Sequence, residues 1–245
     1  MNKAAAYVEN VRNIIDEVLL TQLDSIESAS RELSLALQQG RRIFLFGTGH
    51  SHMLAEEMFF RAGGLVKVQP IFEESLMLHT SASKSAELQQ LSGYANIIFD
   101  HYSMKKGDVL IVFSYSGQSG VCIDMAKLAN EKGLILIAIT NAKKARLGAS
   151  YHSSGKNLYE YADIIIENVG SVSDASIKID GVNVPVAPTS TVIGSMIVNA
   201  VVARTVEMLA QKGIVPEVFA GGDGEINSEI DNKYISKYID EIKFL

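Results

Sequence analysis

The sequence predicts an α/β protein with a doubly wound, five-stranded parallel sheet, added N-terminal helices and a small hairpin. Short apolar runs alternate with segments of helical spacing, a pattern typical of parallel sheets that helices cover on both faces. A turn rich in small residues follows the first apolar run and again the third, each time leading into a helix. No linker or composition break divides the 245 residues, so we expect a single domain over 1–245.

The N-terminal extension, residues 1–40, is predicted to be helical. Apolar residues recur at helical spacing over 4–39, as two helices or one broken helix, and Gly40 is a suitable stop. The first buried strand follows at 43–46. It leads through the turn GTGHSH, residues 47–52, into a helix that carries MLAEEMFF.

The other four strands come from apolar runs further along the chain. They are predicted at 65–72, 108–113, 134–140 and 162–168. The strand at 108–113 leads through the turn SYSGQSG, residues 114–120, into another helix. The region 73–107 is mixed and partly helical.

The last part of the chain adds a hairpin, a long helix and a tail. Residues 176–187 alternate in polarity on both sides of Asp180-Gly181, a dipeptide typical of hairpin turns. After Pro188 a long apolar helix is predicted to run to about Gln211. The segment 213–245 forms a tail, glycine-rich at first and then helical and charged.

Composition excludes several classes of function. The net charge is −6, from 22 basic and 28 acidic residues, and no basic stripe or long lysine/arginine run is present. Nucleic acid and anionic membrane surfaces are therefore not expected partners. The single cysteine, Cys122, excludes an intramolecular disulfide framework and fits a reducing compartment. The N-terminus lacks a signal-peptide core, and no unbroken apolar run approaches the ~18–20 residues of a membrane span, so we expect a cytoplasmic protein.

The two small-residue turns are predicted to face each other across one pocket. In a sheet of the flavodoxin-like order 2-1-3-4-5, strands one and three are neighbours at the topological switch point, where ligands bind beside the carboxyl ends of the strands. In GTGHSH the place of a third fingerprint glycine belongs to His52, so a dinucleotide site is not indicated. Ser51 either binds an anion at a helix N-terminus or simply caps that helix.

The turn SYSGQSG offers more than a helix cap needs. It supplies hydroxyls from Ser114, Ser116 and Ser119 where a cap uses one, and its glycines let the backbone approach a ligand closely. The hydroxyls of Ser116 and Ser119, with the amides of Gln118 and Ser119, form a candidate phosphate site that needs no arginine. The alternative is a serine-rich turn that binds nothing.

Both turns resemble signatures of the sugar isomerase (SIS) domain, a phosphosugar-binding α/β fold. The matching residues are Gly47-Thr48-Gly49-His50-Ser51 and Ser114-Tyr115-Ser116-Gly117-Gln118-Ser119. Residues 149–168 and 186–202 resemble segments of a subfamily of stand-alone SIS proteins that are often labelled phosphoheptose isomerases. The resemblance covers nearly the whole chain. It implies the SIS fold, a phosphorylated sugar or amino sugar as ligand, and a homodimer or higher homo-oligomer, for which the apolar N-terminal helices are suitable.

The resemblance also implies which residues bind the phosphosugar. They are Ser51, Ser114, Ser116 and Ser119 in the two turns, and Thr189 and Ser190 at the start of the long helix. Gly49, His50, Gly117 and Gln118 of the same turns are further candidate binding residues, by their position beside these serines. The metal-binding and catalytic positions of phosphoheptose isomerases are not matched, because their register falls on Glu57 and about Arg61 and the helix 189–211 contains no histidine. We therefore expect no metal and no cofactor.

Candidate acid/base residues follow the second strand. Moving a carbonyl along a sugar requires removal of a proton beside it and its later return, for which a carboxylate or histidine serves. Glu73 and Glu74 stand at the ligand-facing end of the predicted sheet, and His79 belongs to the same loop. The alternative is a solvated pair of loop acids. In HSSGK, residues 152–156, Lys156 is a candidate partner for a phosphate or carboxylate, or part of an ordinary loop.

The leading hypothesis is a sugar-phosphate isomerase that interconverts an aldose and a ketose. Glu74 or Glu73 would act as the base, and a histidine would open the ring or return the proton. One alternative is a lyase or etherase that acts on an amino-sugar phosphate through the same proton abstraction. Another is a non-catalytic sensor that binds a phosphosugar and signals through a partner.

Overall fold

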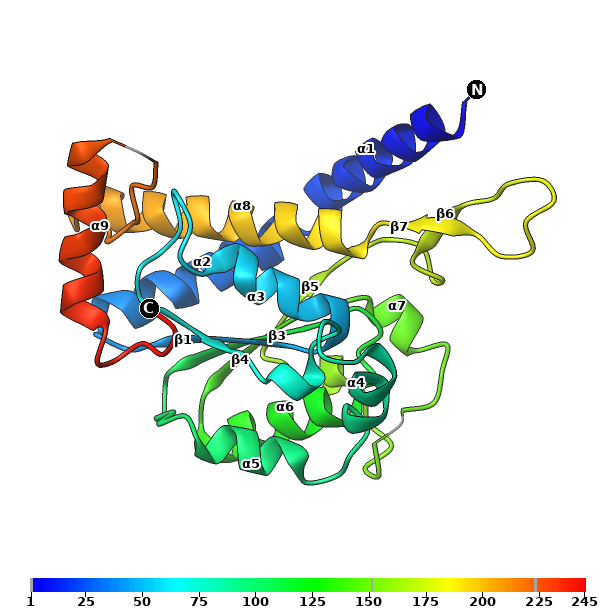
Figure 1. Ribbon diagram of the computed structural model, residues 1–245, viewed down its shortest axis with the longest axis horizontal. Coiled ribbons are helices and arrows are strands. Elements are labelled where there is room, and N and C mark those ends of the chain that lie inside the picture. Colours follow the sequence, from blue (N-terminus) through cyan, green and yellow to red (C-terminus); the bar gives the residue numbers. More distant parts are fainter. Residues whose placement is uncertain (1, 151, 223) are drawn as a thin grey trace.

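The computed structural model describes residues 2–150, 152–222 and 224–245. Its central sheet has five strands, all parallel, in the order β2-β1-β3-β4-β5 (Figure 1). The strands are β1 (Ile43–Gly47), β2 (Val68–Ile71), β3 (Val109–Ser114), β4 (Ile135–Thr140) and β5 (Ile164–Glu167). The predicted fold class is confirmed, with β1 and β3 neighbours at the switch point.

A layer of helices covers each face of the sheet (Figure 1). One layer contains α2 (Leu23–Gln38), α3 (His52–Met58) and α8 (Ser190–Gln211), and the other contains α5 (Tyr94–Asp100) and α6 (Gly120–Lys132). Alternate strand residues point to opposite faces. Ile43 and Leu45 therefore pack with the first layer, whereas Phe44 and Phe46 pack with the second. Burial on both faces explains why the strands are unbroken apolar runs in the sequence.

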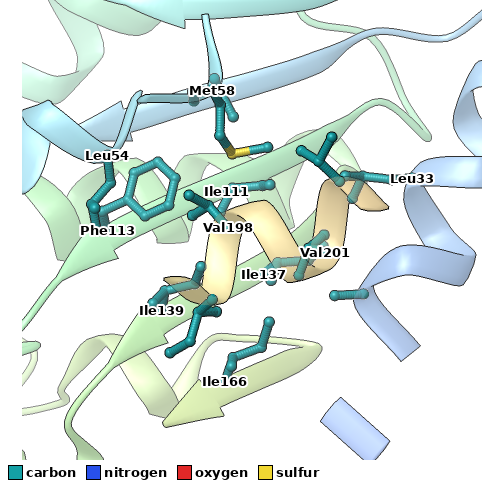
Figure 2. Packing of buried hydrophobic residues seen from close by; sticks show 14 of the residues in the cluster. Leu33, Leu54, Met58, Ile111, Phe113, Ile137, Ile139, Ile166, Val198 and Val201 are labelled. Atoms are coloured by element: carbon teal, nitrogen blue, oxygen red, sulfur yellow. The ribbon is translucent and has the colours of Figure 1, made fainter. Parts of the chain in front are cut away.

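Helix α8 is the central helix of its layer. Figure 2 shows Val198 and Val201 of α8 in one cluster with Ile111 and Ile137 of the sheet and Met58 of α3. Among the described residues, α8 is the one helix long and apolar enough to cross a membrane, with a mean hydropathy of 1.5. Because it packs between α2, α3 and the sheet, its apolar character is that of a core helix.

The N-terminal segment forms two helices, α1 (Lys3–Thr21) and α2, which is one of the two predicted alternatives. The hairpin is also confirmed: β6 (Ala175–Ile177) pairs antiparallel with β7 (Val186–Pro188). Tyr7 of α1 donates its hydroxyl to the carbonyl oxygen of Pro188 at 2.9 Å. Helix α1 and the hairpin protrude together from the layered body (Figure 1), and Val8 and Leu20 of α1 are exposed.

Two predicted elements are shorter in the structure. Helix α3 ends at Met58 because Phe59 is extended and Phe60 has a φ of 44°. Strand β2 does not begin at Leu65, because Leu65 forms an antiparallel bridge with Val218 of the C-terminal segment. The remaining elements are η1 (Gly49–Ser51), η2 (Glu74–Leu76), α4 (Ala82–Leu88), α7 (Ala142–Ala145), η3 (Leu158–Glu160) and α9 (Glu225–Tyr238).

The C-terminal tail packs on its own chain. Tyr238 at the end of α9 and Ile242 form a buried cluster with Val66 and Phe219. The tail thus lies near the amino ends of the strands, away from their carboxyl ends (Figure 1).

Candidate functional site

A pocket opens at the carboxyl edge of the sheet, on the side of α8. Its cavity volume is small, about 20 Å³, and it is continuous with open solvent. Its lining comes from the β1 turn, α3, the β3 turn, the ends of β4 and β5 and the first turn of α8. The lining residues are His50, Ser51, Leu54, Ser114, Tyr115, Ile139, Asn168, Ser190 and Thr191. The structure therefore brings four of the predicted site residues, His50, Ser51, Ser114 and Ser190, to one pocket.

The β1 turn is tight because of its glycines. A side chain at Gly47 would lie 2.6 Å from the carbonyl oxygen of Ser51, and Gly49 has a φ of +57°. His52 is turned inward: its Nδ1 contacts the Gly49 carbonyl oxygen and its ring centroid lies 6.3 Å from that of His79. His50 is exposed and faces the pocket instead.

The β3 turn is held by its own hydroxyls. Ser114 Oγ accepts from the amide of Gly117 at 3.2 Å, and Ser116 Oγ accepts from the amide of Gln118 at 3.3 Å. Gly117 has a φ of +64°, and a side chain there would lie 2.8 Å from Thr140 Oγ1. Ser114 and Ser116 accept in these contacts, which leaves their hydroxyl protons for a ligand.

Residues 89–90 already cap the start of α6. The carbonyl oxygen of Gln89 accepts from Ser119 Oγ at 3.1 Å and from the amide of Val121 at 2.9 Å. The side chain of Gln90 accepts from the amide of Gly120 at 3.1 Å. These donors are the ones that a phosphate at the helix N-terminus would use. A phosphate that binds the Ser119 hydroxyl therefore has to displace Gln89, and one that binds the Gly120 amide has to displace Gln90.

Asp174 caps the start of α8 in the same way. Its carboxylate accepts from the amides of Thr189 and Ser190 at 3.0 and 2.8 Å and from Ser190 Oγ at 2.7 Å. Thr189 is fully buried and does not line the pocket. Ser190 lines the pocket, but its amide and hydroxyl proton are used by Asp174. The negative charge that the helix N-terminus favours is supplied from within the chain.

The predicted acid/base residues lie outside the pocket lining. The carboxylate of Glu73 accepts from Ser75 Oγ at 2.7 Å and from the hydroxyl of Tyr94 at 2.8 Å. Burial, reinforced by this carboxylate, raises the pKa of Tyr94. Glu74 and His79 are exposed on the loop after β2, and His79 reaches the β1 turn only through its contact with His52.

Five lining residues were not predicted: the polar Tyr115, Asn168 and Thr191, and the apolar Leu54 and Ile139. The hydroxyl of Tyr115 donates to the carbonyl oxygen of Ser171 and accepts from Asn141 Nδ2 at 3.1 Å, and burial raises the pKa of Tyr115 to about 12. Lys144 places its ammonium 5.3 Å from the centroid of the Tyr115 ring. Asn168 directly follows β5. We selected Glu74 because residues just after a parallel strand lie at the ligand-facing edge of the sheet, and the same argument applies to Asn168.

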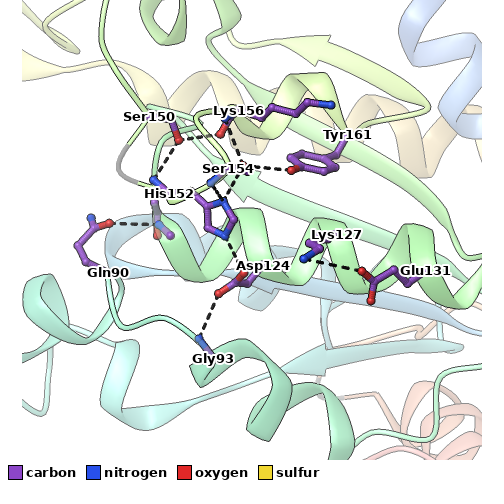
Figure 3. A network of polar contacts seen from close by, with 12 residues as sticks. Gln90, Gly93, Asp124, Lys127, Glu131, Ser150, His152, Ser154, Lys156 and Tyr161 are labelled. Carbon is purple, nitrogen blue, oxygen red and sulfur yellow. Dashed lines mark hydrogen bonds and ion pairs between the residues drawn. The ribbon is translucent and has the colours of Figure 1, made fainter.

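The HSSGK loop is anchored to α6 rather than to the pocket (Figure 3). His152 Nε2 lies 2.7 Å from a carboxylate oxygen of Asp124, and His152 Nδ1 lies 2.7 Å from Ser154 Oγ. The ammonium of Lys156 lies 5.5 Å from the centroid of the Tyr161 ring. Lys156 is not among the lining residues.

No cluster of three or more His, Cys, Asp or Glu side chains suited to a metal ion occurs in the described ranges. Glu57 pairs with Arg61 and accepts from Asn199 Nδ2 at 2.7 Å. The bond from Asn199 ties α3 to α8 and gives Glu57 a structural role.

Comparison with known proteins identifies the family. The family model described as SIS domain matches residues 6–141. A UPF0309 protein from Geobacillus thermodenitrificans is 41% identical over 239 residues, which cover 98% of this chain and 96% of that protein. A UPF0309 protein from Listeria innocua is 36% identical, with 98% and 97% of the two chains covered. The chain belongs to the SIS domain family, and the resemblance found in the sequence is confirmed.

Solved structures share the fold at low sequence identity. A phosphoheptose isomerase from Francisella tularensis matches with a TM-score of 0.55 and 16% identity, covering 84% of this chain and 97% of that one. The phosphoheptose isomerase GmhA from Neisseria gonorrhoeae matches with a TM-score of 0.53, 16% identity and the same coverage, 84% and 97%. At this identity the likeness establishes the fold and leaves the reaction open.

Proposed function

We propose that this SIS-domain protein binds a phosphorylated sugar or amino sugar at the carboxyl edge of its sheet and interconverts an aldose and a ketose. The observation that carries the proposal is the pocket in which the turns after β1 and β3 meet the start of α8. Its polar lining consists mainly of hydroxyl groups, which suit a polyol, and it lies where open α/β sheets bind ligands.

The phosphate is assigned to the β3 turn. Its proposed hydroxyl donors are Ser114, which lines the pocket, and Ser116 and Ser119, which follow it in the same turn outside the lining. Loss of one hydrogen bond to a charged group costs roughly 1.5–3 kcal/mol, or about one to two decades in affinity. Ser116→Ala and Ser119→Ala should each weaken sugar-phosphate binding by that amount, measured by calorimetry. Ser236→Ala, at an exposed position on α9, is the control. Parental affinity in both turn variants would remove the phosphate from this site.

The proton transfer is assigned to Glu74 and His50. Glu74 is exposed at the carboxyl edge and free to approach, whereas Glu73 is held by Ser75 and Tyr94. His50 lines the pocket and carries an imidazole that can return a proton. Removing such a general base lowers the rate by roughly 10²–10⁴.

Deuterium incorporation from heavy water into the bound sugar, followed by NMR, tests this step. Ligands are first selected by a thermal-shift screen of sugar phosphates. Glu74→Gln should bind the selected sugar but exchange slowly, while Glu73→Gln should keep the parental exchange rate. If both variants exchange as fast as the parent, the carboxylate mechanism is wrong. If the parent exchanges nothing with any sugar that it binds, the sensor hypothesis takes the lead.

The proposal includes a homodimer in the cytoplasm. Helix α1 supports it, because Val8, Leu19 and Leu20 are exposed on a helix that protrudes from the body (Figure 1). Exposed apolar side chains gathered on one element are typical of protein interfaces. Light scattering at micromolar protein should give at least twice the monomer mass, and a stable monomer would contradict it.

A further inference from the structure

The wall of the pocket contains a buried hydrogen-bond acceptor that lacks a donor. Asn168 follows β5, is 3% exposed and lines the pocket together with Ser114, Tyr115 and Ser190. Its Oδ1 has no hydrogen-bond partner within the described residues. A buried acceptor in this state is unfavourable unless water or a ligand donates to it. The oxygen therefore marks a place where a donor is to be supplied.

The orientation of this side chain is fixed by its neighbours. The amide of Asn168 donates to the carbonyl oxygen of Thr140 at 2.8 Å, which continues the ladder between β4 and β5. Its Nδ2 donates to the carbonyl oxygen of Ser190 at 2.7 Å. A flipped side chain would set Oδ1 against the Ser190 carbonyl, an acceptor against an acceptor. Oδ1 is thus the free end of a rigidly held amide.

We infer that Asn168 determines which sugar the pocket takes, by accepting a hydrogen bond from one hydroxyl or amino group of the ligand through Oδ1. The inference rests on the proposed function, because it concerns the sugar part of the same ligand. Serine and threonine hydroxyls in the lining can donate or accept, so they discriminate little. The amide oxygen can only accept, so it rejects a sugar that lacks a donor at that position.

Affinities for a matched set of ligands test the inference. Glucose, fructose and glucosamine 6-phosphates are titrated first, followed by the monodeoxy analogues of the one that binds most tightly. In the parent, one analogue should bind roughly 10–100-fold more weakly than the full sugar. In Asn168→Leu the full sugar should bind as weakly as that analogue, so the difference between the two disappears.

Asn157 provides a matched control. It is also buried, at 7% exposure, and its Nδ2 donates to the carbonyl oxygen of Ala145 at 3.5 Å. It lies outside the pocket lining. Asn157→Leu should therefore lower stability and keep the parental discrimination between the full sugar and the analogue.

A second readout needs no variant. The side-chain amide resonances of Asn168 in the parent should shift on binding of the full sugar and much less on binding of the analogue. If Asn168→Leu keeps the parental discrimination, or if the resonances respond equally to both ligands, the inference is overturned while the proposed function stands. If the parent binds none of the sugar phosphates, the proposed function fails and the inference with it.

Discussion

Removing the carboxylate of Asp174 should destabilise the protein and loosen one wall of the pocket. This side chain joins the segment before the hairpin to the first turn of α8, through bonds to the amides of Thr189 and Ser190 and to the hydroxyl of Ser190. Because Ser190 lines the pocket, the perturbation connects helix capping to ligand binding.

The magnitude follows from the three contacts and from the backbone of Asp174. Hydrogen bonds to a charged group contribute roughly 1.5–3 kcal/mol each, but whole N-cap substitutions cost only about 0.5–2 kcal/mol, because water replaces part of what is lost. Asp174 is half-buried, so we expect a cost of about 2–3 kcal/mol for Asp174→Ala. Asp174 also has a φ of 66°, which costs an ordinary residue roughly 1–2 kcal/mol. Asp174→Gly relieves that strain and should therefore be about 1 kcal/mol less destabilising than Asp174→Ala.

Urea unfolding monitored by circular dichroism measures these differences. For Asp174→Ala, the loss corresponds to a fall in Tm of roughly 4–12 °C at this chain length. Asp180→Ala, which removes an exposed carboxylate at the tip of the same hairpin, should stay within about 0.5 kcal/mol of the parent. The reasoning is refuted if Asp174→Ala is as stable as Asp180→Ala, or if the glycine variant is less stable than the alanine variant.

Three further outcomes are expected. Burial raises the pKa of Tyr115 to about 12, so the contribution of its protonated hydroxyl to stability is present below pH 10, its pKa in the unfolded chain, and is lost as the pH rises to about 12. In Tyr115→Phe the urea midpoint should therefore fall less steeply between pH 10 and 12 than in the parent. An equally steep fall in both proteins would contradict this prediction. In Gly117→Ala the new methyl group would stand at a backbone φ of +64° and 2.8 Å from Thr140 Oγ1. The free energy of unfolding should therefore fall by about 2 kcal/mol or more. An unchanged free energy of unfolding would show that the turn relaxes around the methyl group. Gln90→Ala removes the acceptor for the amide of Gly120, so hydrogen exchange at Gly120 should accelerate roughly tenfold, and a parental exchange rate would exclude this cap.

The fold was predictable because the signals that encode it are local. Each strand is a mainly apolar run that both helix layers bury. The alternation of strands and helices predicts a doubly wound sheet, in which β1 and β3 are neighbours. The errors lie where a distant segment intervened. The apolar pattern predicts that a strand starts at Leu65, but Leu65 pairs in an antiparallel bridge with Val218, more than half the chain away. The end of α3 depends on the unusual backbone of Phe60, which its amino-acid type does not favour.

The candidate site was predictable in its position and only partly in its residues. The carboxyl ends of parallel strands meet at one edge, so Ser51 and Ser114 could be placed together from their positions after β1 and β3. The same argument placed Glu74 at that edge, yet it does not line the pocket, because the direction of the loop after β2 is set by its packing. The contacts that occupy Ser119 and Ser190 come from Gln89 and Asp174, which loop packing alone brings near.

These internal caps change how a ligand can be held. Helices α6 and α8 both begin at the carboxyl edge, and in an open α/β sheet such helix starts attract anions. Here the start of α8 already holds the carboxylate of Asp174, and the start of α6 holds the uncharged Gln89–Gln90 segment. A phosphate can replace the uncharged cap on α6 with a gain in electrostatic energy, whereas on α8 it would meet a negative charge. Under the proposed function, we therefore expect the phosphate at α6 and the sugar hydroxyls at the α8 side, which would set the direction in which a sugar phosphate lies across the pocket.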